Sequence, residues 1–154
     1  MEKSLTLADY EALAELRYQI RRFLHFSEQA ARKAGLEPRQ HQLMLTLKGL
    51  PAGTRPRIGE LAERMQIQHH SAVELVDRTE KKGLIHRVRA ESDRREVHVQ
   101  LTPRGDRVLA DLTQHMREEL RSAAPALVST LRKLASRTGK VVRQNSRTEK
   151  AGVA

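Results

Sequence analysis

One stretch near the middle of the chain concentrates hydrogen-bonding side chains on one side of a predicted helix. The helix runs from about His69 to Lys82, and the residues expected to face its core are Ala72, Leu75, Val76 and Thr79. The opposite, polar face comprises His70, Ser71, Glu74, Arg78 and Lys81, and His69 lies at the start of the helix. Imidazole and hydroxyl groups can donate to guanine or accept from adenine, and a carboxylate can accept from the cytosine amino group. These residue types predict contacts with base edges. The alternative for the two histidines is an exposed polar pair that caps the helix without contacting bases.

A second group of charged side chains lies at the turn of a predicted β-hairpin. Residues 96–101 alternate polar and apolar side chains, which predicts a strand, and the polar stretch 89–95 connects it to residues 84–88. The turn contains Asp93, Arg94 and Arg95. Arginine is attracted by phosphates and by the negative potential of a narrow minor groove. Plain solvation of the turn is the alternative. For Arg87 and Arg94 the choice lies between phosphate contacts and salt bridges within the hairpin.

Neighbouring elements would hold these groups in place. A helix of about two turns, residues 58–65, precedes the polar helix and is joined to it by the tight connection 66–68. The pair forms a helix-turn-helix, in which the second helix enters the major groove. A hairpin directly after such a pair is a wing, so residues 38–102 are predicted to form a winged helix-turn-helix.

Long amphipathic helices flank this region. The first, about 5–34, carries one apolar stripe made of Leu13, Leu16, Ile20, Phe23, Leu24 and Ala31. After the wing, Thr102 and Pro103 predict the start of another helix, and Pro125 opens a last one within 103–136. These stripes are hard to bury within one small chain, which predicts that a second copy covers them. Packing within a monomer is the alternative.

The end of the chain has a different composition. Residues 137–154 contain five Lys and Arg against one Glu and show no apolar period, which predicts a basic, disordered tail. The tail could add phosphate contacts or have no role. Residues 1–136 are then one domain. Its predicted fold is mainly α, a winged helix-turn-helix with a two-stranded hairpin wing and long N- and C-terminal dimerisation helices.

The composition restricts the classes of function. A net charge of +10 over 154 residues favours an anionic partner. Aromatic residues make up only 3%, which argues against a stacking platform for single-stranded nucleic acid. The absence of cysteine excludes disulfides and thiolate metal sites. No apolar run has the length of a signal peptide or a membrane span, so a cytoplasmic protein is predicted.

The sequence offers little for a metal site or a catalytic site. Asp111 and His115 are four residues apart on a predicted helix, and His41 could approach them in a dimer. The dense ligand spacing of a committed metal site is missing, so neither a metal nor another cofactor is predicted. The sequence has no glycine-rich phosphate loop, no H-E-x-x-H motif and no nucleophile elbow, so an enzyme is not predicted either.

Several linked motifs between residues 58 and 105 resemble the DNA-binding core of the MarR (multiple antibiotic resistance regulator) family. They are LAERM in the first helix of the pair, SAVELVDR in the second, KKGLI at its exit, and an Asp-x-Arg wing leading into V-x-L-T-x-x-G. The segment GLEPRQHQLML and the long terminal helices are similar to the family's flanks, so the resemblance covers roughly residues 5–136. It implies a triangular homodimer whose terminal helices pair between subunits and whose winged motifs enter neighbouring grooves.

The resemblance also implies roles for particular residues. Asp93 would hold Arg95 so that its guanidinium enters the minor groove, and Arg78 matches a family position that contacts DNA. Family members often sense a small aromatic or anionic effector between the dimerisation helices and the winged motif. The side chains expected there are Arg17, Phe23, His41 and Met44. His41 stands where many relatives have an aromatic residue, and the alternative is a half-buried histidine with satisfied hydrogen bonds.

These observations predict a sequence-specific regulator of transcription that binds double-stranded DNA. It would be an effector-responsive repressor, acting as a homodimer on a pseudo-palindromic operator. Residues 55–105 hold eleven Lys and Arg against eight Asp and Glu, so recognition would depend on placement more than on a positive field. One alternative is a sequence-tolerant architectural DNA-binding protein driven by charge and the tail. Another is a protein-interaction module that reuses the winged fold without DNA.

Overall fold

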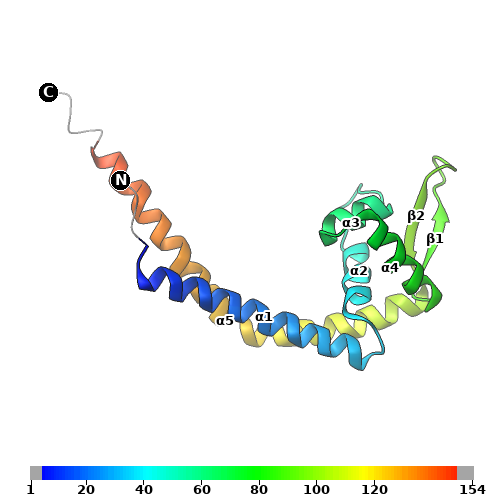
Figure 1. The fold of residues 1–154 in the computed structure, drawn as a ribbon, viewed down its shortest axis with the longest axis horizontal. Helices are drawn as coiled ribbons and strands as arrows, with labels where there is room; N and C mark the ends of the chain where they lie inside the picture. The colour runs from blue at the N-terminus through cyan, green and yellow to red at the C-terminus, as the bar shows by residue number, and fades with distance from the viewer. Residues whose placement is uncertain (1–4, 149–154) are drawn as a thin grey trace. The chain divides into compact units, whose positions relative to one another are not determined.

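The computed structural model describes the backbone of residues 5–148 and the side chains of residues 5–136. In chain order the elements are α1 (Leu7–Lys33), α2 (Pro38–Lys48), α3 (Ile58–Met65), α4 (His69–Lys81), β1 (Ile85–Arg89), β2 (Val97–Leu101) and α5 (Pro103–Thr148), as Figure 1 shows. The predicted fold class, mainly α with a two-stranded hairpin wing, is confirmed. The chain divides into two compact units, Ser27–Met116 and the pair of segments before Ser27 and after Met116.

The unit Ser27–Met116 is built around the helix-turn-helix. Its core is formed by fully buried side chains from α2, α3, α4 and the hairpin: Leu43, Met44, Leu61, Leu75, Val76, Ile85 and Val99. The turn between α3 and α4 depends on Gln66, which ends α3 in the left-handed conformation with φ of 55°. Its neighbour Ile67 donates its backbone N–H to the Ala62 carbonyl at 3.0 Å. This sharp turn fixes the direction in which α4 leaves α3.

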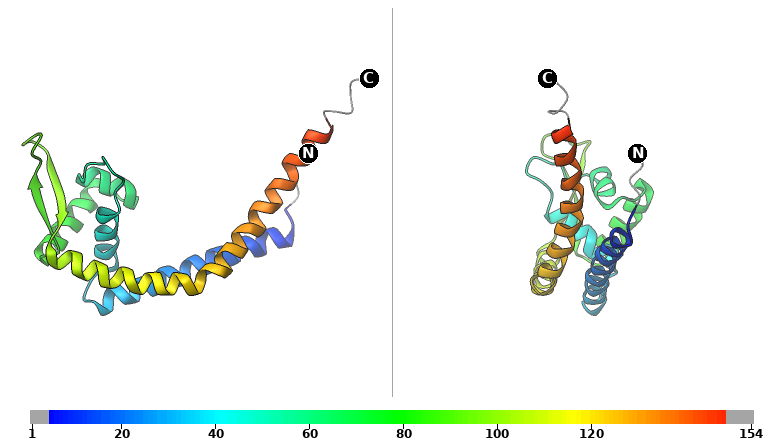
Figure 2. Two further views of the ribbon diagram at one scale, coloured as in Figure 1. Left: turned by 180° about the vertical axis from the view of Figure 1, so that it is seen from behind. Right: turned by 90° about the vertical axis from the view of Figure 1, so that its left-hand side faces the viewer.

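The hairpin follows α4 directly and is antiparallel, with Ile85 paired to Leu101 and Arg89 to Val97. Figure 2 shows both strands extending from the end of α4 to a free tip. Thr102 joins the base of the hairpin to its surroundings. Its hydroxyl donates to the Gly83 carbonyl at 2.7 Å and accepts the N–H of Gly105 at 3.0 Å, which is the predicted cap of the next helix.

The last helix differs from the sequence prediction in two ways. α5 is one continuous helix with Pro125 inside it, where two helices were predicted. It also continues through residues 137–148, where the sequence predicts the start of a disordered tail. Proline removes only one backbone hydrogen bond, and residues 137–148 contain no proline and several good helix formers. The rest of the predicted tail, residues 149–154, lies outside the described residues.

The second compact unit pairs the N-terminal part of α1 with the part of α5 after Met116. Within it, the Gln19 amide donates to the Thr130 hydroxyl at 3.3 Å, and Thr130 is buried. Many large apolar side chains of these helices are nevertheless exposed: Leu7, Tyr10, Leu13, Tyr18, Ile20, Leu24, Leu120, Val128 and Leu131. One chain alone therefore leaves an apolar face on this unit.

None of the helices in the described part of the chain combines the length and the apolar character that crossing a membrane requires.

Gly105 lies where α5 passes closest to the base of the hairpin, and we expect it to tolerate no side chain. A Cβ there would lie 2.0 Å from the Leu84 carbonyl oxygen, a backbone atom that cannot move aside. Gly105→Ala should lower the free energy of unfolding by about 2–3 kcal/mol. The measurement is urea unfolding at fixed protein concentration.

Gly59→Ala in α3 is the control, because a Cβ there meets nothing within 4 Å. Removing a helical glycine should raise stability by up to about 1 kcal/mol. Equal effects of the two substitutions would contradict the close approach.

Candidate nucleic-acid interface

The two faces of α4 are divided as the sequence predicts. Ala72, Leu75, Val76 and Thr79 are all buried, and the Thr79 hydroxyl donates to the Leu75 carbonyl at 2.7 Å. On the other face His69, His70 and Glu74 are exposed and Ser71 is half-buried. The first turn of α4 therefore presents imidazole, hydroxyl and carboxylate groups to solvent, all of them groups that can recognise base edges.

Arg78 lies two turns further along the exposed face of α4. Its guanidinium is 3.4 Å from the Glu37 carboxylate, and both side chains are about half exposed. Such an exposed pair contributes little to stability. Arg78 can therefore exchange Glu37 for an external phosphate at small cost.

The wing tip exposes Asp93, Arg94 and Arg95, and Asp93 contacts Arg95 through the Arg95 backbone. The Asp93 carboxylate accepts the backbone N–H of Arg95 at 2.9 Å, and the Asp93 carbonyl accepts the N–H of Glu96 at 2.9 Å. Short aspartate side chains commonly cap the backbone two residues on, which explains this geometry. The carboxylate thus shapes the turn, and the Arg95 guanidinium has no ion-pair partner among the side chains of residues 5–136.

Arg87 on β1 is engaged inside the protein. Its guanidinium pairs with Asp77 at 2.6 Å and with Glu80, and its backbone N–H donates to Glu80 at 2.8 Å. Desolvation opposes the charged form, but hydrogen bonds and charges from both carboxylates raise the pKa of Arg87 above its ordinary value. The geometry supports the salt-bridge alternative for Arg87, which fastens β1 to α4.

A second ion-pair group, which the sequence did not predict, fastens β2. Glu96 pairs with Arg55 at 3.0 Å and with Arg57 at 3.1 Å, and its own side chain is only 11% exposed. The available signal was weak. It consisted of two arginines around Pro56 in a loop and one glutamate beside the wing tip, some forty residues apart.

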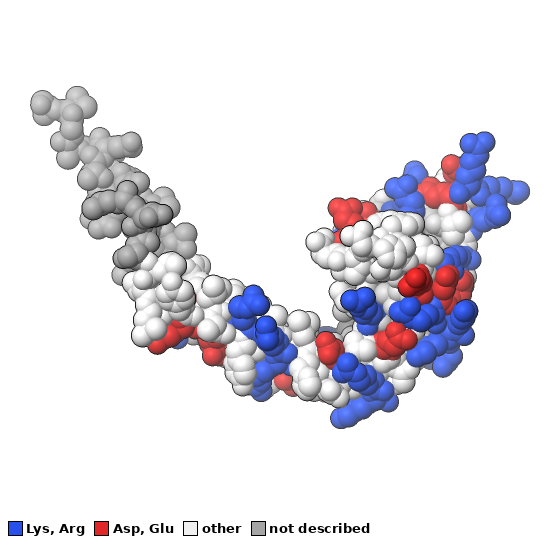
Figure 3. Space-filling view, in the orientation of Figure 1, with Lys and Arg blue, Asp and Glu red and all other residues white. Residues whose placement is uncertain are grey.

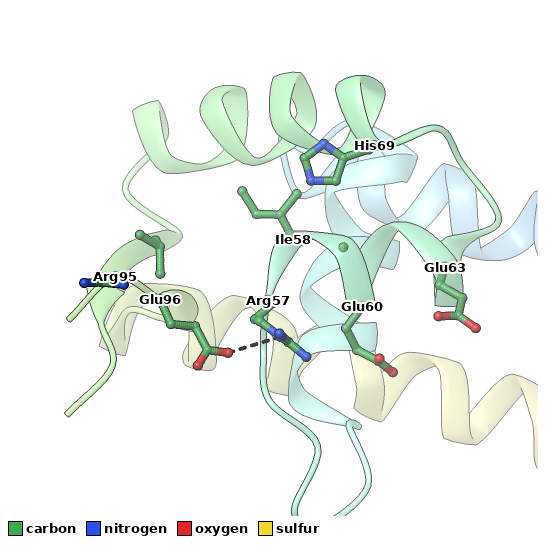
Figure 4. A pocket seen from close by; sticks show the side chains of 9 residues that line it. Arg57, Ile58, Glu60, Glu63, His69, Arg95 and Glu96 are labelled. Atoms are coloured by element: carbon green, nitrogen blue, oxygen red, sulfur yellow. Dashed lines mark ion pairs between the residues drawn. The ribbon is translucent and has the colours of Figure 1, made fainter. Parts of the chain in front are cut away.

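The start of α4 and the wing meet at an open pocket of about 540 Å³. Its lining includes His69 from the start of α4, Arg57 and Glu60 from the start of α3, and Arg95 and Glu96 from the wing (Figure 4). Two residues predicted independently to contact DNA, His69 and Arg95, thus lie around one concave surface.

Positive charge on this unit is concentrated at the end of the wing and is mixed with negative charge elsewhere on the visible face (Figure 3). Figure 3 shows Lys and Arg side chains gathered at the end of the wing, with acidic side chains placed among the basic ones along the rest of the visible face. The distribution agrees with the nearly balanced composition of residues 55–105. It favours contacts by a few positioned arginines over a uniform positive field.

The residues predicted to bind an effector fall into both compact units. Arg17 is exposed and Phe23 half-buried in one unit, whereas His41 and Met44 belong to the other. Met44 is fully buried and packs in the core. His41 is 4% exposed, but its Nε2 has no hydrogen-bond partner, so the predicted alternative of a half-buried, satisfied histidine does not fit it. Effector binding by these residues stays a prediction.

No metal-binding group is formed by the described side chains, since no three His, Asp or Glu residues within 5–136 come together. His115 and Asp111 do contact each other. The contact joins the His115 Nδ1 to the Asp111 backbone carbonyl at 2.8 Å and leaves the carboxylate out.

Comparison with known proteins agrees with this geometry. Residues 34–96 match the model of the MarR family. Over 64 residues the chain is 36% identical to YsmB of Bacillus subtilis (strain 168), described as an uncharacterized HTH-type transcriptional regulator; the match covers 42% of this chain and 44% of YsmB.

Solved structures extend the likeness of fold to most of the chain. The crystal structure of AbsC, a MarR family transcriptional regulator from Streptomyces coelicolor, is 22% identical with a TM-score of 0.68, covering 92% of this chain and 99% of AbsC. CouR from Rhodococcus jostii RHA1, solved with p-coumaroyl-CoA bound, is 22% identical with a TM-score of 0.63, covering 86% and 96%. The fold and the exposed face define a winged helix-turn-helix protein. Residues 34–96 match the MarR family model, and the chain has the fold of solved MarR family structures.

The burial of His41 predicts a loss of stability in acid. Desolvation lowers the pKa of His41 from its ordinary value of 6.5, so the folded state keeps the ring neutral where the unfolded chain takes up a proton. The free energy of unfolding should therefore fall as the pH drops below about 6.5, down to the lowered pKa of the folded state. Urea unfolding between pH 7.5 and 5 measures the slope.

His41→Gln should flatten this slope, whatever its effect on absolute stability. His25→Gln, at an exposed position of α1, is the control and should leave the slope unchanged. If the His41 variant keeps the full acid slope, His41 is not its source.

Proposed function

We propose that this protein is a sequence-specific regulator of transcription that binds duplex DNA as a homodimer. The observation that carries the proposal is the pairing of two exposed groups around one pocket: the first turn of α4, with His69, and the wing, with Arg95. A winged helix-turn-helix brings these two elements to adjacent grooves of one duplex. The match of residues 34–96 to the MarR family supports this use of the fold.

Each exposed side chain then has a role set by its chemistry. His69, His70, Ser71 and Glu74 contact base edges in the major groove, because the N-terminal residues of a recognition helix lie closest to the bases. Arg95 enters the minor groove, where A·T-rich sequence narrows the groove and strengthens its negative potential. Arg78 and Arg94 contact phosphates, which fix the register without reading sequence.

A second copy of the chain covers the apolar face of α1 and α5. Leu13 is 52% exposed, Leu24 51% and Leu131 46%, and side chains of this kind gain about 25 cal/mol for each Å² that leaves water. Dimerisation also supplies two winged motifs, and a pseudo-palindromic operator with half-sites about 34–36 Å apart accommodates both. Two half-sites read together give far greater specificity than one.

The proposal includes repression relieved by a small aromatic or anionic effector. Support comes from the relatives: CouR is described as bound to p-coumaroyl-CoA, a molecule with both an aromatic and an anionic part. An effector that binds the DNA-free arrangement of the dimer more tightly would weaken DNA affinity, with a coupling of about 1–3 kcal/mol.

Binding to DNA tests the main proposal. The purified protein should bind the intergenic DNA upstream of its own gene far more tightly than unrelated DNA, and the ratio should persist as salt rises. Arg95→Ala should weaken specific binding by about 1–3 kcal/mol and reduce the preference for A·T-rich flanks. Fluorescence anisotropy across a salt series measures both.

Arg21→Ala is the control, since it removes the same charge at an exposed position of α1. A ratio near one with a steep salt slope would instead identify a sequence-tolerant architectural protein. No DNA binding at all would favour a protein-interaction module.

The dimer is tested by placing a charge on the apolar face. Ile20 is 44% exposed on α1, and Ile20→Arg should shift the protein toward monomer because an interface would have to bury an unpaired guanidinium. Glu11→Arg introduces the same side chain at another exposed position of α1, outside the apolar stripe, and should leave the dimer intact. Sedimentation velocity over a concentration series gives the result. A monomeric wild-type protein would contradict the proposal.

A further inference from the structure

The carboxylate of Glu96 is the meeting point of three basic side chains. Its Oε2 lies 3.0 Å from a guanidinium nitrogen of Arg55, and its Oε1 lies 3.1 Å from Nε of Arg57. Nε2 of His98 is 3.4 Å from the same Oε1. Figure 4 shows Arg57 and Glu96 facing each other across the edge of the pocket. We call Arg55, Arg57 and Glu96 the wing clamp.

The wing clamp joins two segments that are far apart in sequence. Arg55 and Arg57 lie in the loop that leads into α3, and Arg57 is the residue immediately before that helix. Between them, Pro56 accepts the backbone N–H of Val99 at 2.8 Å, and Val99 is fully buried. One backbone hydrogen bond and two ion pairs therefore fasten β2 to the start of α3.

The position of the clamp relates the wing to the recognition helix. Glu96 directly follows Arg95 in the chain, and both residues line the pocket that His69 borders from α4. α4 is held to α3 by the tight turn at Gln66, so a wing fastened to the start of α3 has a fixed position relative to His69. We propose that Glu96 is a positioning residue for DNA recognition, because it sets the separation between the major-groove residues of α4 and the minor-groove Arg95. This inference rests on the proposed function.

The negative charge of Glu96 distinguishes a positioning role from plain repulsion between its carboxylate and the DNA phosphates. Near DNA a carboxylate repels the phosphates, so removing it should strengthen binding if charge alone matters. If Glu96 positions the wing, removing its charge releases Arg55 and Arg57, loosens the wing and weakens specific binding. The two explanations predict changes of opposite sign.

The test compares Glu96→Gln with Glu91→Gln. Both remove one negative charge from the wing region. Glu91 is an exposed residue of the tip with no ion pair to the side chains of residues 5–136, whereas the Glu96 side chain is 11% exposed and pairs with Arg55 and Arg57. Glu96→Gln should bind operator DNA about five- to tenfold more weakly and lose part of the preference for A·T-rich flanks. Glu91→Gln should bind as tightly as the wild type or more tightly.

A measurement without DNA separates the clamp from the proposed function. Amide hydrogen exchange at Val99 reports the bond to Pro56, and it should be faster in Glu96→Gln and unchanged in Glu91→Gln. The amide of Ala72, which donates to Gln68 inside the helix-turn-helix, should exchange as in the wild type and so confirm that the variant is folded. Arg57→Gln combined with Glu96→Gln should add little to the exchange rate, since the two side chains act together.

Two results would overturn the inference. Unchanged Val99 exchange in Glu96→Gln, together with binding as tight as that of Glu91→Gln, would show that the clamp does not position the wing. A wild-type protein without preference for any operator would remove the proposed function, and the role of Glu96 in DNA recognition with it.

Discussion

The burial of one face of α4 determines where the proposed contacts with the major groove lie. Leu75 and Val76 are at most 1% exposed, and Ala72 and Thr79 are fully buried. Rotating α4 would expose these apolar side chains to water, which would cost several kcal/mol. The opposite face of the helix therefore stays toward solvent. The backbone positions of His69, His70 and Glu74 on the solvent side are set by this buried face and need no further contacts.

The wing has no comparable core and is held by charge and by a few backbone contacts. Arg87 fastens β1 to α4 through Asp77 and Glu80, and Glu96 fastens β2 to the loop before α3. Beyond Arg89 and Val97 the hairpin has no buried side chain except Ala90. The tip side chains are therefore exposed while ion pairs hold the base of the hairpin, an arrangement that suits the proposed entry of Arg95 into a minor groove.

The sequence predicted those features that depend on periodicity and missed those that depend on pairing. The buried and exposed faces of α4 follow from 3.6-residue spacing, and the hairpin follows from alternation, so both were predicted and are confirmed. The contact between Arg57 and Glu96 joins positions separated by thirty-nine residues, and no local pattern distinguishes it from two solvated charges. The course of α5 through Pro125 has the same origin: proline marks a helix boundary only where nothing else holds the helix together.

These pairings also change what the net charge means. The formal charge of +10 suggests a broadly basic surface, yet Arg55, Arg57 and Arg87 are each opposed by a carboxylate at close range. Paired guanidinium groups contribute less to non-specific attraction than free ones, because the carboxylate cancels their field within a few ångströms. Arg55 and Arg57 share the one carboxylate of Glu96, whereas Arg94 and Arg95 have no ion-pair partner among the side chains of residues 5–136. Arginines paired with carboxylates of the same chain contribute less to non-specific DNA affinity. The exposed arginines that have no such partner are then the ones whose positions matter, which agrees with the proposed sequence-specific binding.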